Sequence, residues 1–331
     1  MDHATETEVA EAAKHLRTLS SGLNEVLFGQ QELIDLVITG ILARGHILLE
    51  GLPGLGKTEL VKGLSKLLHL DTKRVQFTPD LLPGDITGNP VLQEVDGRRE
   101  FVFQPGPLFT NIVLADEINR ASPKTQSALL EAMQERRVTV LGRTHELPKP
   151  FFVLATQNPI ELEGTYPLPE AQLDRFLLQV DVAYPSRAAE RAILLATTGA
   201  TESSAHAVFD AEGLIAAQSV IRRMPVGEAV VEAILDLVRA CRPGEAEGSG
   251  VAGSLAWGPG PRAAQALMLT VRARALLEGR LAPGIADVAA MAKPVLEHRM
   301  ALSFAARARG ETLSGLIDRM VGQVLRLEAA A

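Results

Sequence analysis

The pattern of apolar and polar residues changes near Tyr184 and divides the chain into two parts. Before that point, short apolar runs typical of buried strands alternate with segments of helical spacing. The five strand-like runs are residues 46–50, 72–77, 111–117, 151–156 and 176–180. Near-continuous apolar strands separated by helices are typical of a mostly parallel sheet that is covered on both faces. The first part therefore predicts an α/β domain.

The second part of the chain has few strand signals and is rich in alanine. Its amphipathic segments of helical spacing are residues 230–239, 261–277 and 285–300. The stretch 243–250 is rich in glycine and glutamate, which predicts a loop. We therefore expect two domains: an α/β domain over residues 1–184, with an N-terminal helical segment, and an all-helical domain over residues 185–331.

Two segments of the first part have the pattern of β-hairpin insertions. Residues 92–103 have strand-like halves on either side of Asp96-Gly97, which is a strong signal of a hairpin turn. Residues 137–147 predict a second hairpin before the fourth strand.

Composition narrows the classes of function. The chain of 331 residues is 47% hydrophobic, and its net charge of −7 without a long basic run argues against nucleic acid as a partner. Its one cysteine, Cys241, excludes an intrachain disulfide. The acidic start lacks the order of a signal peptide, and no apolar stretch approaches about 18 residues. We expect a cytoplasmic protein with no membrane span.

The most specific motif lies at residues 51–58, whose sequence Gly-Leu-Pro-Gly-Leu-Gly-Lys-Thr fits the phosphate-binding loop pattern G-x-x-x-x-G-K-[ST]. A strand-like run precedes it and a helical segment follows, as this loop requires. Glycines let backbone N–H groups approach a phosphate, and the helix N-terminus adds partial positive charge. The loop residues expected to contact ATP are Gly51, Pro53, Gly54, Leu55, Gly56, Lys57, Thr58 and Glu59.

Within this loop, Lys57 is expected to reach the β- and γ-phosphates, and the Thr58 hydroxyl is expected to bind Mg²⁺. The third strand-like run ends in Asp116 and Glu117, at the edge where parallel strands present their carboxyl ends to a ligand. We expect Asp116 to hold Mg²⁺ and Glu117 to orient or deprotonate the attacking water. Asn158 ends the next strand, where an amide can fix that water and sense the γ-phosphate.

Four further motifs resemble those of the MoxR family of AAA+ ATPases. They are residues 77–88, 117–121 (Glu-Ile-Asn-Arg-Ala), 155–159 (Ala-Thr-Gln-Asn-Pro) and 169–176 (Pro-Glu-Ala-Gln-Leu-Asp-Arg-Phe). The similarity extends from residues 28–30 to residues 261–263. It implies an AAA+ core with a helical lid, and a homo-oligomeric ring, commonly a hexamer, with ATP between subunits. Family members are chaperone-like ATPases that mature or activate client protein complexes, often with a von Willebrand factor A partner.

The resemblance also assigns roles to individual residues. Gly29 and Gln30 would lie beside the adenine, Asn158 matches sensor 1, and Arg175 matches the arginine finger that enters the neighbouring subunit's site. Arg262 matches sensor 2, which reports the γ-phosphate from the lid. A guanidinium suits both arginine roles because it stays charged and forms forked bonds to phosphate oxygens.

The resemblance to the MoxR family also bears on the start of the lid helix and on the two hairpins. Gly260 stands before Pro261, where the family more usually has a serine, and a glycine there would loosen the helix start and weaken sensing by Arg262. The family resemblance implies that the first hairpin is inserted in helix 2 of the AAA+ core and that the second lies before sensor 1. Both would then face the ring's pore, where Arg98 and Arg99 would touch a client or remain as a solvated hairpin tip.

The leading function is therefore an ATP-driven remodeller of protein complexes. Two alternatives stay open: a motor subunit of magnesium-chelatase type, which shares the helix-2 insertion, and a binding switch that senses ATP with little turnover. Capture of a chelatase catalytic subunit would favour the first alternative, and a turnover assay decides the second.

Overall fold

The structure is a computed structural model that describes residues 3–51, 56–95, 98–158, 164–198, 207–244 and 253–325. Its centre is a five-stranded sheet in the order β2-β5-β8-β1-β9, and every neighbouring pair is parallel. The strands are β1 (Ile47–Glu50), β2 (Thr72–Gln76), β5 (Ile112–Asp116), β8 (Phe152–Gln157) and β9 (Leu178–Asp181). All five predicted strands are thus confirmed, with ends that differ by one or two residues.

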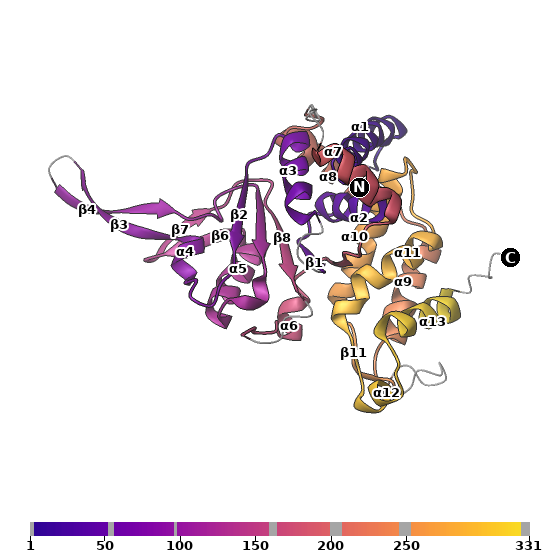
Figure 1. The fold of residues 1–331 in the computed structure, drawn as a ribbon. Helices are drawn as coiled ribbons and strands as arrows, with labels where there is room; N and C mark the ends of the chain where they lie inside the picture. Colours follow the sequence, from indigo (N-terminus) through magenta and orange to yellow (C-terminus); the bar gives the residue numbers. More distant parts are fainter. Residues whose placement is uncertain are drawn as a thin grey trace.

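Alternate side chains of these strands enter two separate hydrophobic cores. On β1, Ile47 and Leu49 face one core, whereas Leu48 faces the other. The first core is shared with helices α1 (Glu6–Asn24), α2 (Gln31–Leu42) and α3 (Lys57–Leu68). The second is shared with α4 (Pro83–Thr87) and α5 (Pro123–Glu135), on the opposite face of the sheet (Figure 1). The continuous apolar character of β1, β5 and β8 follows from this burial on both faces, whereas the edge strand β2 buries only Val75.

The C-terminal part is mainly helical and packs directly against α1 and α2. Its helices are α7 (Arg187–Thr198), α8 (Ala211–Arg223), α9 (Glu228–Ala240), α10 (Pro261–Leu277), α11 (Ile285–Leu296), α12 (Phe304–Ala308) and α13 (Leu313–Leu325). Helix α10 packs on α2, and the residues of these helices join the first core without interruption. A short antiparallel pair, β10 (Leu255–Trp257) and β11 (Ala301–Leu302), also lies here and was not predicted, because strands of two or three residues have no measurable periodicity.

Both predicted hairpins are present. Strands β3 (Gly88–Val95) and β4 (Arg98–Pro105) form a long hairpin that projects from the body, and its predicted turn residues Asp96 and Gly97 lie outside the described residues (Figure 1). Strands β6 (Arg137–Val140) and β7 (Arg143–Glu146) form the second. The rings of Phe103 and His145 stack at 3.9 Å, so the base of the first hairpin rests on the second.

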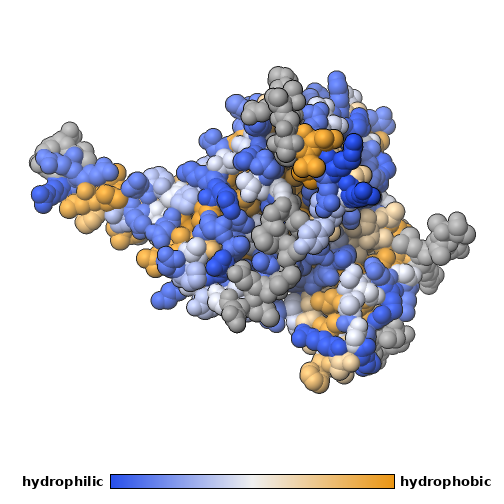
Figure 2. Space-filling model, viewed as in Figure 1, coloured by the Kyte–Doolittle hydropathy of each residue, from blue (hydrophilic) through white to orange (hydrophobic). Residues whose placement is uncertain are grey.

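The outer part of the first hairpin is apolar and exposed. Leu92 and Phe101 pair across the two strands, and they are 51% and 67% exposed. Figure 2 shows hydrophobic atoms along the same projection. This exposed apolar pair belongs to neither hydrophobic core and therefore contributes little to folding.

Candidate functional site

A hollow of about 320 Å³ lies where strands β2, β5 and β8 end and α3 begins. We call it the α3 hollow. It is lined by Gly51, Gly56, Lys57, Thr58, Glu59, Arg74, Gln76, Asp116, Glu117, Thr156 and Asn158. Residues 52–55 of the loop lie outside the described residues, and with them the predicted contacts Pro53, Gly54 and Leu55. The fold therefore brings together the eight predicted site residues that this hollow contains.

Lys57 starts α3 and is half-buried in the α3 hollow. Gly56 precedes it with a φ of +80°, a left-handed conformation that favours glycine, so the chain turns sharply from loop into helix. The Lys57 Nζ donates to the Gly51 carbonyl oxygen at 2.6 Å. Burial lowers the pKa of Lys57, and the carboxylates of Asp116, Glu117 and Glu50 oppose that shift. A partly desolvated ammonium is well suited to receive an anion such as a phosphate.

Asp116 ends β5 and accepts two short hydrogen bonds. Its Oδ2 accepts from Arg74 Nη2 at 2.6 Å, and its Oδ1 accepts from Thr156 Oγ1 at 2.6 Å. With the Thr58 hydroxyl in the same hollow, oxygen donors suited to Mg²⁺ are present. No cluster of three or more His, Cys, Asp or Glu side chains that could hold a metal occurs among the described residues. This donor set fits a Mg²⁺ that shares its coordination with nucleotide phosphates and water.

Glu117 adopts a left-handed backbone conformation, with φ +56° and ψ +51°. Such a conformation is uncommon for a residue with a side chain, and it concentrates at functional sites where the surroundings hold it in place. Here the Glu117 N–H donates to Thr156 Oγ1 at 2.8 Å. Its Oε2 accepts from Gln76 Nε2 at 2.8 Å and from Arg120 Nη1 at 3.1 Å. The carboxylate is thus held in one orientation within the α3 hollow.

Gly29 and Gln30 line a larger cleft, the α2 cleft, of about 1100 Å³. It lies between α2, the chain after β9 and helices α10 and α11. Gly29 has a φ of +71°, and a Cβ there would lie only 2.7 Å from the Ala189 Cβ, so both conformation and space require glycine. A smaller cavity shares Asp181 and Val182 with this cleft and Gly51 with the α3 hollow. The hollows therefore form a row of neighbouring spaces along one edge of the sheet.

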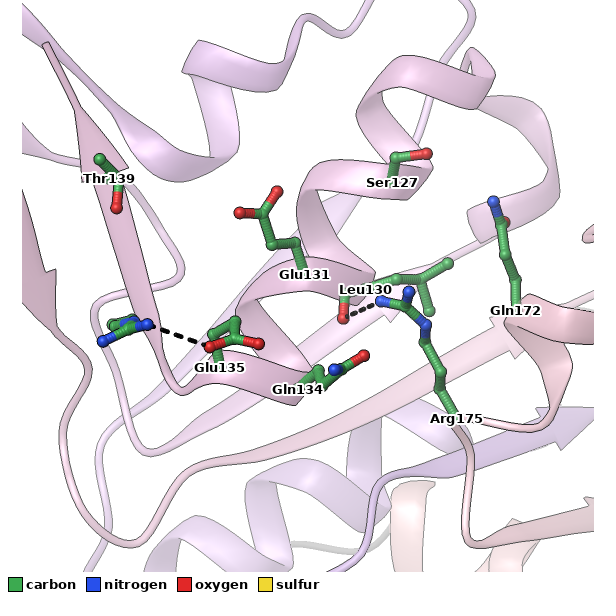
Figure 3. Close-up of a pocket in the computed structure, with 9 residues that line it drawn as sticks. Ser127, Leu130, Glu131, Gln134, Glu135, Thr139, Gln172 and Arg175 are labelled. Carbon is green, nitrogen blue, oxygen red and sulfur yellow. Dashed lines mark hydrogen bonds and ion pairs between the residues drawn. The ribbon is translucent and has the colours of Figure 1, made fainter. Parts of the chain in front are cut away.

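Arg175 lies away from the α3 hollow, in a pocket of about 400 Å³ on α5. In this α5 pocket the exposed Arg175 side chain donates from Nη1 to the Leu130 carbonyl oxygen at 2.9 Å (Figure 3). The carboxylates of Glu131 and Glu135 come from the same helix (Figure 3). Arg175 therefore does not line the α3 hollow of its own chain.

Arg262 also stays outside the α3 hollow. Its Nη1 forms an ion pair with Asp174 Oδ2 at 3.3 Å, and its side chain is 55% exposed. Gly260, two residues before Arg262, has ordinary extended backbone angles, and no atom of the described residues lies within 4 Å of where its Cβ would stand. It gives the start of α10 no side-chain cap. The structure therefore contains nothing that requires a glycine in place of a capping serine.

Comparison with known proteins agrees with this arrangement. Residues 46–178 match the ATPase family associated with various cellular activities (AAA), and residues 249–319 match the AAA lid domain. Chaperone MoxR1 of Mycobacterium tuberculosis is 41% identical over 94% of this chain and 83% of its own length. The uncharacterized protein YeaC of Bacillus subtilis is 42% identical over 91% of this chain and 92% of its own length.

The chain belongs to the MoxR family of AAA+ ATPases.

A solved structure supports the same assignment for this MoxR-family ATPase. A crystal structure from Cytophaga hutchinsonii superposes with a TM-score of 0.90 at 35% sequence identity, and the match covers 96% of this chain and 97% of that one. The predicted AAA+ core, helical lid and ATPase activity are therefore confirmed. Among the described residues of this MoxR-family ATPase, no helix has the length and apolar character that a bilayer crossing needs.

Three residues of the α3 hollow were not predicted: Arg74, Gln76 and Thr156. Arg74 and Gln76 lie two residues apart on β2 and therefore on the same face. Arg74 donates to Asp116, the last residue of β5, and Gln76 donates to Glu117, the residue that follows it. The polar composition of β2, in which only Val75 is buried, was a usable signal that this strand lies at the edge of the sheet. What the sequence could not show is that β2 pairs with β5.

Proposed function

We propose that this MoxR-family ATPase binds MgATP along the row of hollows between Gly29 and Asn158 and uses hydrolysis to remodel, mature or activate client protein complexes. The observation that carries the proposal is the convergence of Lys57, Thr58, Asp116 and Glu117 on the α3 hollow. In this proposal the phosphates lie against Lys57 and the loop, and the adenine lies in the α2 cleft beside Gly29 and Gln30.

In the same proposal, Thr58 and Asp116 would hold Mg²⁺, which when bound would supply positive charge against the nucleotide phosphates. Asp116 is now paired with Arg74, so a bound cation would compete with that guanidinium for the carboxylate. Glu117 accepts a proton from the attacking water, and Asn158 fixes this water from the end of β8. The fixed orientation of the Glu117 carboxylate supports its role as the base.

We further propose that the subunits form a hexameric ring in which Arg175 completes the neighbour's site. Its location in the α5 pocket, outside its own hollow, is what supports a role in trans. The chaperone name of the 41% identical relative supports a protein client, and a von Willebrand factor A partner follows from the family resemblance alone. The exposed pair Leu92 and Phe101 is the proposed contact with the client.

We expect Lys57→Ala to weaken ATP binding roughly tenfold or more, since a charged hydrogen bond contributes about 1.5–3 kcal/mol. Titration with a fluorescent ATP analogue measures this. Lys66→Ala, which removes an exposed lysine from the last turn of the same helix, is the matched control and should bind normally. If Lys57→Ala and Lys66→Ala bind ATP with equal affinity, the α3 hollow is not the phosphate site.

The proposed sensor role of Arg262 makes a separate prediction. Arg262 now pairs with Asp174, so a bound γ-phosphate would have to replace Asp174 as the partner of Arg262. ADP has no γ-phosphate and cannot do so. Arg262→Ala should therefore reduce the preference for ATP over ADP, measured by calorimetry with both nucleotides. Arg307→Ala, an exposed arginine of α12, serves as the control. An unchanged ratio of the two affinities in Arg262→Ala contradicts the sensor role.

A further inference from the structure

Most of the hydrogen bonds that attach the segment carrying Arg175 to the lid come from a buried arginine, Arg299. Arg299 ends the short 3₁₀ helix η2 (Glu297–Arg299), and its side chain is 3% exposed. Its guanidinium makes bonds to Asp174 Oδ1 (2.8 Å), Asp174 O (3.3 Å), Phe176 O (2.6 Å), Leu177 O (3.2 Å) and Val295 O (2.5 Å). These five bonds match the five N–H donors that an arginine has.

Four of the five bonds of Arg299 go to the segment 174–177, and one goes to Val295 in the preceding helix α11. A buried charge is tolerated only where it is paired and its remaining donors are satisfied. Burial lowers the pKa of Arg299, and the bond to Asp174 opposes that shift. His298 adds one more link, because its Nε2 lies 3.1 Å from the Phe176 carbonyl oxygen. The backbone on both sides of Arg175 is therefore fixed to the lid, while the Arg175 side chain stays exposed.

Asp174 joins this attachment to the proposed sensor. It accepts from Arg299 through Oδ1 and from Arg262 through Oδ2. The Arg262 pair is solvent-exposed and therefore weak, so it can exchange for another anion. The Arg299 pair is buried and satisfied on every donor, so it persists. A change in lid position would then be transmitted through Arg299 to the Asp174–Leu177 segment, which leads directly into β9 of the sheet.

We infer that Arg299 is a positioning residue for Arg175, because it links the lid to the segment 174–177. The nucleotide bound to a subunit sets its lid position, and through Arg299 the lid position sets where Arg175 lies relative to the neighbouring subunit's site. This inference rests on the proposed action of Arg175 in trans. A purely structural role for Arg299 differs from it, because loss of fold would damage the subunit's own nucleotide site as well.

The test is Arg299→Lys, which keeps the charge but cannot form the five-bond fork. We expect its ATP affinity to stay within about threefold and its turnover to fall roughly tenfold or more, as for a loss confined to the transition state. An equimolar addition of Lys57→Ala protein, which has an intact finger and a defective pocket, should raise turnover clearly above the sum of the two separate samples. Arg280→Lys is the matched control. It loses the forked bond to buried Asp287 in the same lid but contacts no residue of the 174–177 segment, and it should keep its turnover.

Unchanged turnover in Arg299→Lys contradicts the inference. So does low turnover that Lys57→Ala protein fails to restore, when the same protein restores Arg175→Ala, since the damage then lies in the subunit's own site or fold. Should Arg299→Lys fail to fold, Asp174→Asn weakens the same link and should also lose turnover that Lys57→Ala protein restores. Because Asp174 also pairs with Arg262, the ATP and ADP affinities of Asp174→Asn are compared with those of Arg262→Ala to separate the two effects. If Arg175→Ala itself turns over normally, the proposed finger is wrong, and this result is independent of any measurement on Arg299.

Discussion

Replacing Arg175 with alanine is expected to leave ATP binding intact and to reduce turnover on the order of 10³-fold or more, the range for arginine fingers. The physical reason is that a guanidinium stabilises the charge that develops on the transferring phosphoryl group. In this structure Arg175 bonds the Leu130 carbonyl oxygen in the α5 pocket and not a group of its own α3 hollow. Its loss should therefore affect the neighbour's site only. Phosphate release and binding of a fluorescent ATP analogue, measured on the same samples, separate the two effects.

Mixing experiments make this prediction specific to action in trans. Arg175→Ala protein has an intact pocket, and Lys57→Ala protein has an intact finger, so mixed rings should recover part of the activity that each lacks alone. Arg307→Ala, an exposed arginine of the lid, should behave as the unmutated protein. Turnover per subunit that is independent of protein concentration, down to samples shown to be monomeric, would exclude a finger supplied by a neighbour.

Replacing Glu117 with glutamine is expected to preserve nucleotide binding and to lower turnover roughly 10²-fold or more, the contribution of general-base catalysis. Glutamine has nearly the same shape and keeps an oxygen that accepts from Gln76 and Arg120, so the α3 hollow should keep its geometry. It cannot accept the proton of the attacking water. Nucleotide binding and phosphate release, assayed as for Arg175, test both halves of this expectation.

Glu228→Gln is the matched control for Glu117→Gln, because Glu228 is an exposed carboxylate at the start of α9, outside the α3 hollow. Hydrolysis by Glu117→Gln at the unmutated rate would show that another group acts as the base. A Glu117→Gln protein that binds ATP without hydrolysing it also provides the reagent for capturing a client complex, with the apolar hairpin residues Leu92 and Phe101 as the surface to alter first.

The sequence by itself determined the local elements. The central strands β1, β5 and β8 were predicted because residues buried on both faces form continuous apolar runs, and both hairpins were predicted from strand-like halves around a turn. The phosphate loop was recognised because the residues that would bind a phosphate follow one another in the chain and form a fixed sequence pattern. Lys57, Thr58, Asp116, Glu117 and Asn158 were all expected near one ligand, and all line the α3 hollow. Each of these signals lies within a few neighbouring residues.

Only the tertiary structure decided which distant segments meet. The sheet order β2-β5-β8-β1-β9 places Arg74 against Asp116, 42 positions later in the chain, and nothing in the local pattern of either strand specifies that pairing. The same holds for Asp174, which lies between Arg262 and Arg299 of the lid. Periodicity reports the environment of each residue, buried or exposed, but not the identity of its partner. Long-range partners are selected by the packing of the whole core, and that selection joins the lid to the Arg175 segment.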